Sequence, residues 1–180
     1  MLDKYNQAIQ KYFEKWYKLL ETRSNKQFFA QLQPTAIGWK VADRTEYNTL
    51  LTELHDSSDM IVEKWMNGRW IAKVHLKDTE LDHDMQIIKI MERRPGSSDA
   101  VGLDHIDFYD PSRVDLTAVL NDEKDIRWSQ ESNDVMADYE WLSVWFADTE
   151  AKLKHYTVLG IIGAELDELE RQIIHAATKR

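Results

Sequence analysis

Residues 102–109 read Gly-Leu-Asp-His-Ile-Asp-Phe-Tyr, an apolar strand pattern that carries one histidine and two aspartates. Pro111 follows and is expected to begin a helix that ends near Asn121. Three more strands are predicted after this helix, over 126–130, 140–146 and 150–158, with the last two turning at Asp148-Thr149. The stretch therefore opens a unit whose element order is β-α-β-β-β.

The residues before this stretch predict the same order. A strand over 35–41 precedes an amphipathic helix over 43–54, and three strands follow over 60–66, 69–77 and 85–93. Asn67-Gly68 is a strong hairpin signal because both residue types tolerate positive φ. At an offset of 69, Ile37 corresponds to Ile106, and at an offset of 63, Lys89–Glu92 corresponds to Lys152–His155. We interpret the chain as a tandem duplication.

Helical segments flank the two units. Seven large apolar residues recur at helical spacing near the start and predict one or two helices over 3–33, closed by Pro34: Tyr5, Ile9, Tyr12, Phe13, Trp16, Leu19 and Leu20. The prediction is a single α+β domain over 1–180. It comprises a helical extension (1–34), a first unit (35–94), a second unit (102–158) and a C-terminal helix (159–180).

Composition limits the partners. The chain has 23 basic and 32 acidic residues, and a net charge of −9 argues against broad binding to nucleic acid or an anionic membrane. The absence of cysteine excludes disulfides, thiol nucleophiles, zinc fingers and iron–sulfur ligation. No apolar run approaches the ~18 residues of a spanning helix, and no secretory signal follows Met1. We therefore expect a cytoplasmic protein.

Short motifs in both units resemble the vicinal oxygen chelate superfamily, which includes glyoxalases, extradiol dioxygenases and antibiotic-resistance proteins. Within it, the chain is similar to the YecM-like bacterial proteins, which are described as metal-dependent. The motifs are Trp65–Arg69, Ile90-Met91-Glu92 before a Pro-containing loop, Gly102–Asp107 and Leu153-Lys154-His155. The resemblance implies tandem β-α-β-β-β units in a curved mixed sheet around a cavity.

The resemblance also implies metal ligands on the first and last strand of each unit. Strand alternation puts four residues at these positions: Ala36, Glu92, His105 and His155. Ala36 cannot bind a metal, whereas two imidazoles and one carboxylate suit Zn, Fe(II), Mn or Ni. Lys40 would hold a carboxylate or phosphate group of the ligand. Trp39 alternates to the opposite face, where we expect it to pack beneath a helix.

Each of these residues has a structural alternative. His105 is equally well explained as a hydrogen-bonded structural histidine. For Glu92 the alternative is a surface ion pair with Arg93 or Arg94. For His155 the alternative is an exposed strand residue next to lysines. Lys40 has the alternative of an ordinary exposed strand lysine.

Two functions follow from these alternatives. The first is a small-molecule-binding protein of vicinal oxygen chelate type that uses a divalent metal at Glu92, His105 and His155, as a lyase, isomerase or dioxygenase. The second, which we favour, is a metal-free ligand-binding or non-catalytic interaction module that kept the fold without a ligand at Ala36. In either case we expect a small-molecule ligand. A homodimer closed by the N-terminal aromatic residues is a further expectation.

Overall fold

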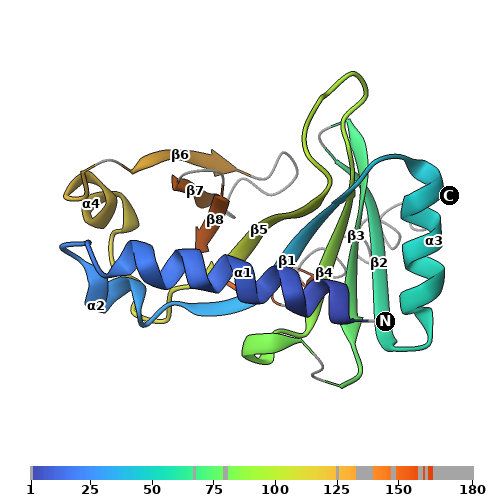
Figure 1. Ribbon diagram of the computed structural model, residues 1–180, viewed down its shortest axis with the longest axis horizontal. Helices are drawn as coiled ribbons and strands as arrows, with labels where there is room; N and C mark the ends of the chain where they lie inside the picture. Colours follow the sequence, from blue (N-terminus) through green and yellow to red (C-terminus); the bar gives the residue numbers. More distant parts are fainter. Residues whose placement is uncertain are drawn as a thin grey trace, which may run out of the picture.

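The computed structural model describes residues 2–66, 68–78, 81–124, 126–132, 140–146, 149–157, 160 and 162–163. Its strands form one curved, mixed sheet of eight strands in the order β2-β3-β4-β1-β5-β8-β7-β6 (Figure 1). The elements before the middle of the chain are α1 (Asp3–Leu20), α2 (Lys26–Phe29), β1 (Gln33–Val41), α3 (Arg44–His55), β2 (Ser58–Met66), β3 (Arg69–Leu76), a 3₁₀ helix (Asp82–Asp84) and β4 (Ile87–Glu92). Those after it are β5 (Gly102–Tyr109), α4 (Leu116–Asn121), β6 (Arg127–Ser132), β7 (Glu140–Phe146) and β8 (Thr149–Lys154).

The predicted α+β class and the repeated β-α-β-β-β order are confirmed. In each half the first strand pairs in parallel with the last, β1 with β4 and β5 with β8. The two first strands, β1 and β5, pair antiparallel and join the halves. Gly38 pairs with Lys89 in one half and Asp107 with Lys152 in the other, which reproduces the offsets of 69 and 63 seen in the sequence.

Helices cover one face of the sheet, and α1 lies across it (Figure 1). The apolar spacing of α1 puts Tyr12 and Trp16 inward, and Trp16 stacks on Phe108 of β5 with ring centroids 4.8 Å apart. Trp39 packs against Tyr5 of α1 at 4.7 Å, which confirms its predicted place beneath a helix. The N-terminal aromatic residues are thus buried against this chain's own sheet, and the homodimer stays a prediction.

The second unit differs from the sequence prediction at two boundaries. The helix expected from Pro111 begins at Leu116, so that prediction was wrong. The Asp110 carboxylate accepts hydrogen bonds from the backbone N–H groups of Ser112 and Val114 and holds a turn instead, and Asp115 caps the helix. The last strand ends at Lys154 rather than at residue 158.

Some predictions fall on residues that the structure does not describe. Asn67 and Asp148, at the two predicted turns, lie outside the described residues, although the pairs Met66–Arg69 and Phe146–Thr149 flank them as expected. Of the C-terminal helix over 159–180, only Gly160, Ile162 and Gly163 are described, and these are helical. Among the described helices, none is long and apolar enough to cross a membrane.

Candidate functional site

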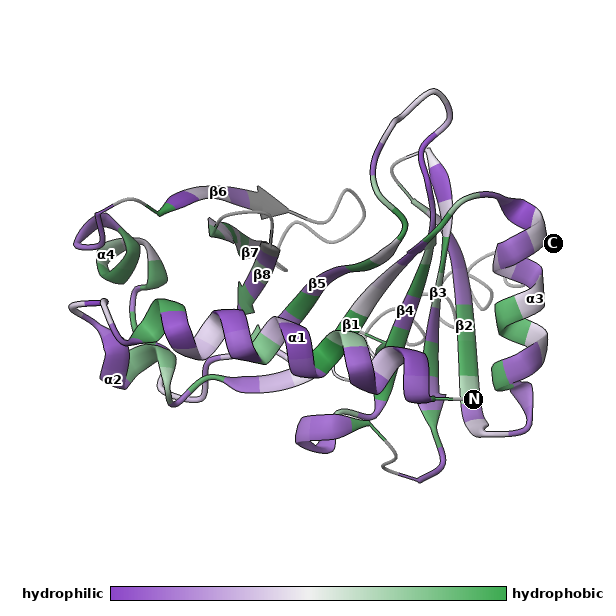
Figure 2. Ribbon diagram, viewed as in Figure 1, coloured by the Kyte–Doolittle hydropathy of each residue, from purple (hydrophilic) through white to green (hydrophobic). Residues whose placement is uncertain are grey.

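Lysines line the face of the sheet opposite α1, α3 and α4. The strand registers bring five of them to this face: Lys40 (β1), Lys73 (β3), Lys89 (β4) and Lys152 and Lys154 (β8). We call these five residues the lysine face; all but the partly exposed Lys152 are buried. Polar bands interrupt the apolar colouring of β3 and β4 in Figure 2. Buried lysines are rare unless they are paired with groups of opposite charge, so anionic partners are expected on this face.

His105 lies at the centre of this face and is fully buried. It sits on β5 directly opposite Gly38 of β1. A Cβ atom added to Gly38 would lie within 2.6 Å of both ring nitrogens of His105, so the imidazole ring lies over the place where another residue would have its side chain. Gly38 thereby lets His105 reach across β1 towards Lys89 on β4.

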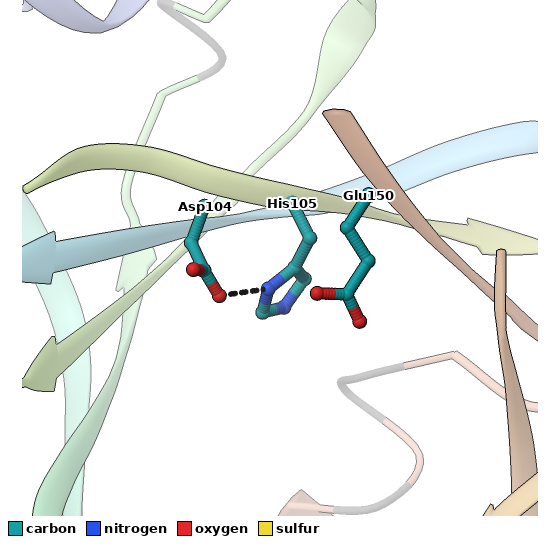
Figure 3. A group of neighbouring side chains, drawn as sticks. All are labelled: Asp104, His105 and Glu150. Atoms are coloured by element: carbon teal, nitrogen blue, oxygen red, sulfur yellow. Dashed lines mark hydrogen bonds and ion pairs between the residues drawn. The ribbon is translucent and has the colours of Figure 1, made fainter. Parts of the chain in front are cut away.

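A β-bulge brings Asp104 to the same face as His105. Gly38 pairs with His105 and Trp39 with Leu103, so β5 has one more residue than β1 at this point. Such an extra residue changes the direction of the side chains around it. Asp104 and His105 therefore point to the same side of the sheet, with Glu150 of β8 beside them (Figure 3).

Hydrogen bonds and ion pairs connect these side chains. His105 Nδ1 lies 2.8 Å from Asp104 Oδ2, and His105 Nε2 lies 2.9 Å from Lys89 Nζ. Lys89 Nζ also donates to Asp107 Oδ2 at 2.7 Å, and Lys154 Nζ lies 2.7 Å from Asp107 Oδ1. Lys40 Nζ lies 2.6 Å from Asp104 Oδ1. The network therefore runs from Lys40 on β1 to Lys154 on β8.

The surroundings fix the protonation state of His105. Burial, together with the positive charges of Lys152 and Lys89, lowers the pKa of His105 to about 3. The neutral ring holds its proton on Nδ1, because the carboxylate of Asp104 can only accept a hydrogen bond. Nε2 is then the acceptor for the ammonium group of Lys89, whose pKa is lowered by burial to about 8.

The carboxylates of the network are ionised. Burial raises the pKa of Asp107, but the positive charges of Lys154 and Lys89 outweigh burial and hold that pKa well below its usual value. Burial likewise raises the pKa of Asp104, and the hydrogen bonds from His105 and Lys40 outweigh it. The network is therefore a set of true ion pairs around a neutral imidazole.

The structure brings only some of the predicted residues together. His105 and Lys40 lie in the network, and Lys40 there binds the carboxylates of Asp104 and Asp99. Glu92 lies on the helix side of β4, where it accepts a hydrogen bond from the backbone N–H of Trp70 at 3.1 Å and faces Arg44 at 3.4 Å. Glu92 thus forms an ion pair, as expected if its role is structural, but its partner is Arg44 and not Arg93 or Arg94.

His155 lies beyond the end of β8, where Nδ1 is 3.4 Å from Asp110 Oδ2. It lines a pocket of about 240 Å³ together with Asp115, Gln130 and Trp141. Glu92, His105 and His155 therefore do not converge as one set of metal ligands. Ala36 is buried on the lysine face beside Ile87 and Ile162 and offers no ligand atom.

Sequence reasoning missed Lys89, Glu150 and Lys154 as site residues. Their signal was a charged residue in the interior of an apolar strand, as in Ile-Ile-Lys-Ile-Met over 87–91. The apolar residues Ile88 and Ile90 of this strand face the helices, so Lys89 between them lies on the opposite face.

A different group of side chains has the spacing of metal ligands. Asp104, His105 and Glu150 each offer one ligand atom, and these atoms lie within 4.8 Å of one another (Figure 3). Each of the three, however, already has an ammonium group nearby. Lys40 is 2.6 Å from Asp104, Lys89 is 2.9 Å from His105 Nε2, and Lys152 is 3.9 Å from Glu150. Like charges 4 Å apart repel by ~4 kcal/mol per unit charge pair near a protein surface, so this set does not fit a divalent cation while the lysines are charged.

Two polar groups in β7 have no hydrogen-bond partner within the described part of the chain. They are Ser143 Oγ and Trp141 Nε1, both buried atoms. The register pairs Ser143 with Lys152, so Ser143 belongs to the same face of the sheet as the lysines, and Trp141 lies two residues before it on that strand. Buried polar groups normally have partners, and a bound ligand would supply one.

Comparison with solved structures finds several similar chains, of which the first described here supports the fold. The structural-genomics protein EC4020 is similar with a TM-score of 0.60 at 15% identity, over 91% of this chain and 93% of that one. A methylmalonyl-CoA epimerase in complex with methylmalonyl-CoA and NH4+ gives 0.45 at 16%, over 69% and 95%. The hypothetical protein BH1468 from Bacillus halodurans gives 0.42 at 12%, over 71% and 97%. Neither protein-family models nor curated proteins give a match to the sequence.

Proposed function

We propose that this protein binds a small organic anion, a carboxylate or a phosphate ester, on the lysine face beside His105. We also propose, on the repeated unit and the strand order, that it belongs to the vicinal oxygen chelate superfamily. The proposed function is binding without a resident divalent metal, because the candidate ligands are already paired with lysines.

The observation that carries this proposal is an excess of positive charge in a buried place. Among the described residues, Lys40, Lys89, Lys152 and Lys154 meet three largely buried carboxylates, those of Asp104, Asp107 and Glu150, and Lys89 and Lys154 share that of Asp107. Asp99 also reaches Lys40, but its side chain is half exposed. A buried charge needs a partner of opposite sign, and an anionic ligand would provide it.

The unpartnered groups of β7 fit the same ligand. Ser143 Oγ and Trp141 Nε1 can both donate a hydrogen bond to a carboxylate or phosphate oxygen. Ser143 pairs with Lys152 in the register, and Lys152 Nζ lies 5.5 Å from the centroid of the Trp141 ring, so a ligand at that lysine would be held by one charge and two neutral donors. Lys40, the predicted anion-binding residue, lies on the same face and adds its positive charge to the electrostatic field there.

Binding is tested by calorimetric titration with malonate, succinate and 2-phosphoglycolate. Malonamide and succinamide serve as neutral analogues of the same shape. We expect the anions to bind and the amides not to bind, and Lys152→Met to weaken anion binding by roughly 10- to 100-fold, the value of one charge-assisted hydrogen bond. Lys4→Met is the matched control, since it removes the same charge from the exposed surface of α1. Equal binding of anions and amides, or equal losses in both variants, would contradict the proposal.

A further inference from the structure

We infer that the ammonium group of Lys89 occupies the place of a divalent metal ion, so that removing it uncovers a latent metal site. The inference concerns Lys89, which the sequence did not single out. It does not depend on which ligand the lysine face binds.

The contacts of Lys89 Nζ are of the kind that a metal ion makes. It lies 2.9 Å from His105 Nε2 and 2.7 Å from Asp107 Oδ2, an imidazole nitrogen and a carboxylate oxygen. Both atoms present lone pairs to it, since His105 carries its proton on Nδ1. Imidazole nitrogen and carboxylate oxygen are the usual ligands of Zn²⁺ and of Co²⁺-type ions.

The rest of the site is arranged to keep this cation in place. Gly38 leaves space for the His105 ring, and Asp104 accepts the Nδ1 proton, so Nε2 is aimed at Lys89. A carboxylate that orients a histidine in this way is the usual second partner of metal-bound imidazole. The site is therefore built around a cation, and the chain supplies that cation itself.

Replacing Lys89 by a neutral residue makes the net charge of the site more negative. Asp104, Asp107 and Glu150 would then meet one fewer positive charge, and His105 Nε2 would lose its donor. The vacated position would keep two ligand atoms that are already aimed at it, His105 Nε2 and Asp107 Oδ2, and water can complete the coordination. A divalent ion would restore both the charge and the partner of the imidazole.

Lys89 also has a role if the proposed function holds, and this step rests on that function. An ammonium group has three protons, and two of them go to His105 and Asp107. The third has no acceptor within the described residues and is available to an anionic oxygen of the ligand. Lys89 would then supply the positive charge that a metal supplies as a Lewis acid.

The test is a Co²⁺ titration, followed by visible absorption and by metal analysis after dialysis. The proteins are the wild type, Lys89→Met, and the double variant Lys89→Met with His105→Gln. We expect Lys89→Met to bind about one equivalent at least ~100-fold more tightly than the wild type, with the double variant losing that site. Lys73→Met is the matched control, because Lys73 is a buried lysine that pairs with Lys89 in the register. It should gain no site.

Two results would overturn the inference. One is a folded Lys89→Met, or the more polar Lys89→Gln, that binds Co²⁺ no better than the wild type. The other needs no Lys89 variant: a one-equivalent Co²⁺ site in the wild type that His105→Gln abolishes. Nitrogen NMR of wild-type His105 gives a further check, since Nε2 should keep the shift of a hydrogen-bonded, unprotonated nitrogen when Zn²⁺ is added. Anion titrations are separate from these measurements, so a failure here is distinguishable from a failure of the proposed function.

Discussion

Gly38 is the residue on which the arrangement of the site depends most directly. Gly38 does not have a positive φ, so glycine is needed here because it leaves space and not because of its conformational freedom. The His105 ring fills that space, and a methyl group would meet both ring nitrogens within 2.6 Å. Because the ring is fully buried and hydrogen-bonded on both sides, it has no easy way to move.

We predict that Gly38→Ala destabilises the protein by about 1–3 kcal/mol, the usual cost of overpacking a core. It should also displace His105 from Lys89 and weaken binding on the lysine face. Urea unfolding measures the first effect and calorimetry the second. Gly163→Ala is the matched control, because no atom of the described part of the chain lies within 4 Å of the added methyl group and the residue is helical. The prediction fails if both variants unfold at the same urea concentration.

At the scale of elements, α1 holds the two halves of the sheet together. Trp16 packs on Phe108 of β5 at 4.8 Å and on Phe146 of β7 at 5.2 Å, while Tyr5 packs on Trp39 of β1. The Tyr12 hydroxyl donates to the backbone carbonyl of Glu150, one of the residues beside His105. The helix therefore supports the site through the sheet, from the opposite face.

We expect Trp16→Ala to lower the free energy of unfolding by about 3–5 kcal/mol, as for other large buried aromatic residues. That loss corresponds to a drop of roughly 6–20 °C in Tm for a chain of this size. Differential scanning calorimetry measures it. Tyr17→Ala, the next residue and 53% exposed, should change stability by no more than about 0.5 kcal/mol. Equal changes in the two variants would show that α1 is not packed as described.

The sequence was sufficient to predict the order of these elements but not the composition of the site. The periodicity of 43–54 and the apolar strand at 102–109 predict their elements because local patterns specify local structure. Alternation within a strand, however, does not say which of its two faces turns to the helices. Ile88 and Ile90 face the helices, so Glu92 goes with them and Lys89 goes to the side of His105.

The bulge at Asp104 was also beyond sequence reasoning. It depends on how β5 pairs with β1, strands that are far apart in the chain, and it changes the phase of alternation between Leu103 and His105. Likewise, a lysine in a strand usually indicates a solvent-facing position. Lys89 and Lys154 are buried only because Asp107, from a third strand, lies between them.

At the scale of the whole molecule, an acidic protein with net charge −9 encloses a buried basic face. Keeping lysines charged in such a place costs stability, and the lowered pKa of Lys89, about 8, expresses that cost. Burial lowers the pKa of Lys152 and Lys154 as well. The stability of the molecule should therefore depend on pH in a range where most proteins show little change.

We predict that the free energy of unfolding rises as pH increases from about 8 towards 9.5. In this range the unfolded chain keeps the Lys89 proton, since an ordinary lysine has a pKa of about 10.5, whereas the folded chain loses it. The unfolded state thus binds more protons, and raising the pH favours the folded state. Urea unfolding at pH 7.5, 8.5 and 9.5 measures the slope.

Lys89→Met should reduce this rise and Lys4→Met should leave it unchanged. The range stops below pH 10 because burial raises the pKa of Tyr5 and Tyr47, which gives the opposite slope above that pH. A stability that falls between pH 8 and 9.5 would contradict the assignment of Lys89 as a buried cation.

The register of the two halves has a consequence for how such a site can arise at all. Gly38 and Asp107 are equivalent positions of the two repeats, as are Lys89 and Lys152. In a symmetric pair of identical chains, equivalent positions must hold the same residue, so space and charge could not be divided between them. Joining both copies in one chain removes that constraint. In this single chain the two positions differ: Gly38 provides the recess for the histidine, and Asp107 provides the counter-charge for the lysine.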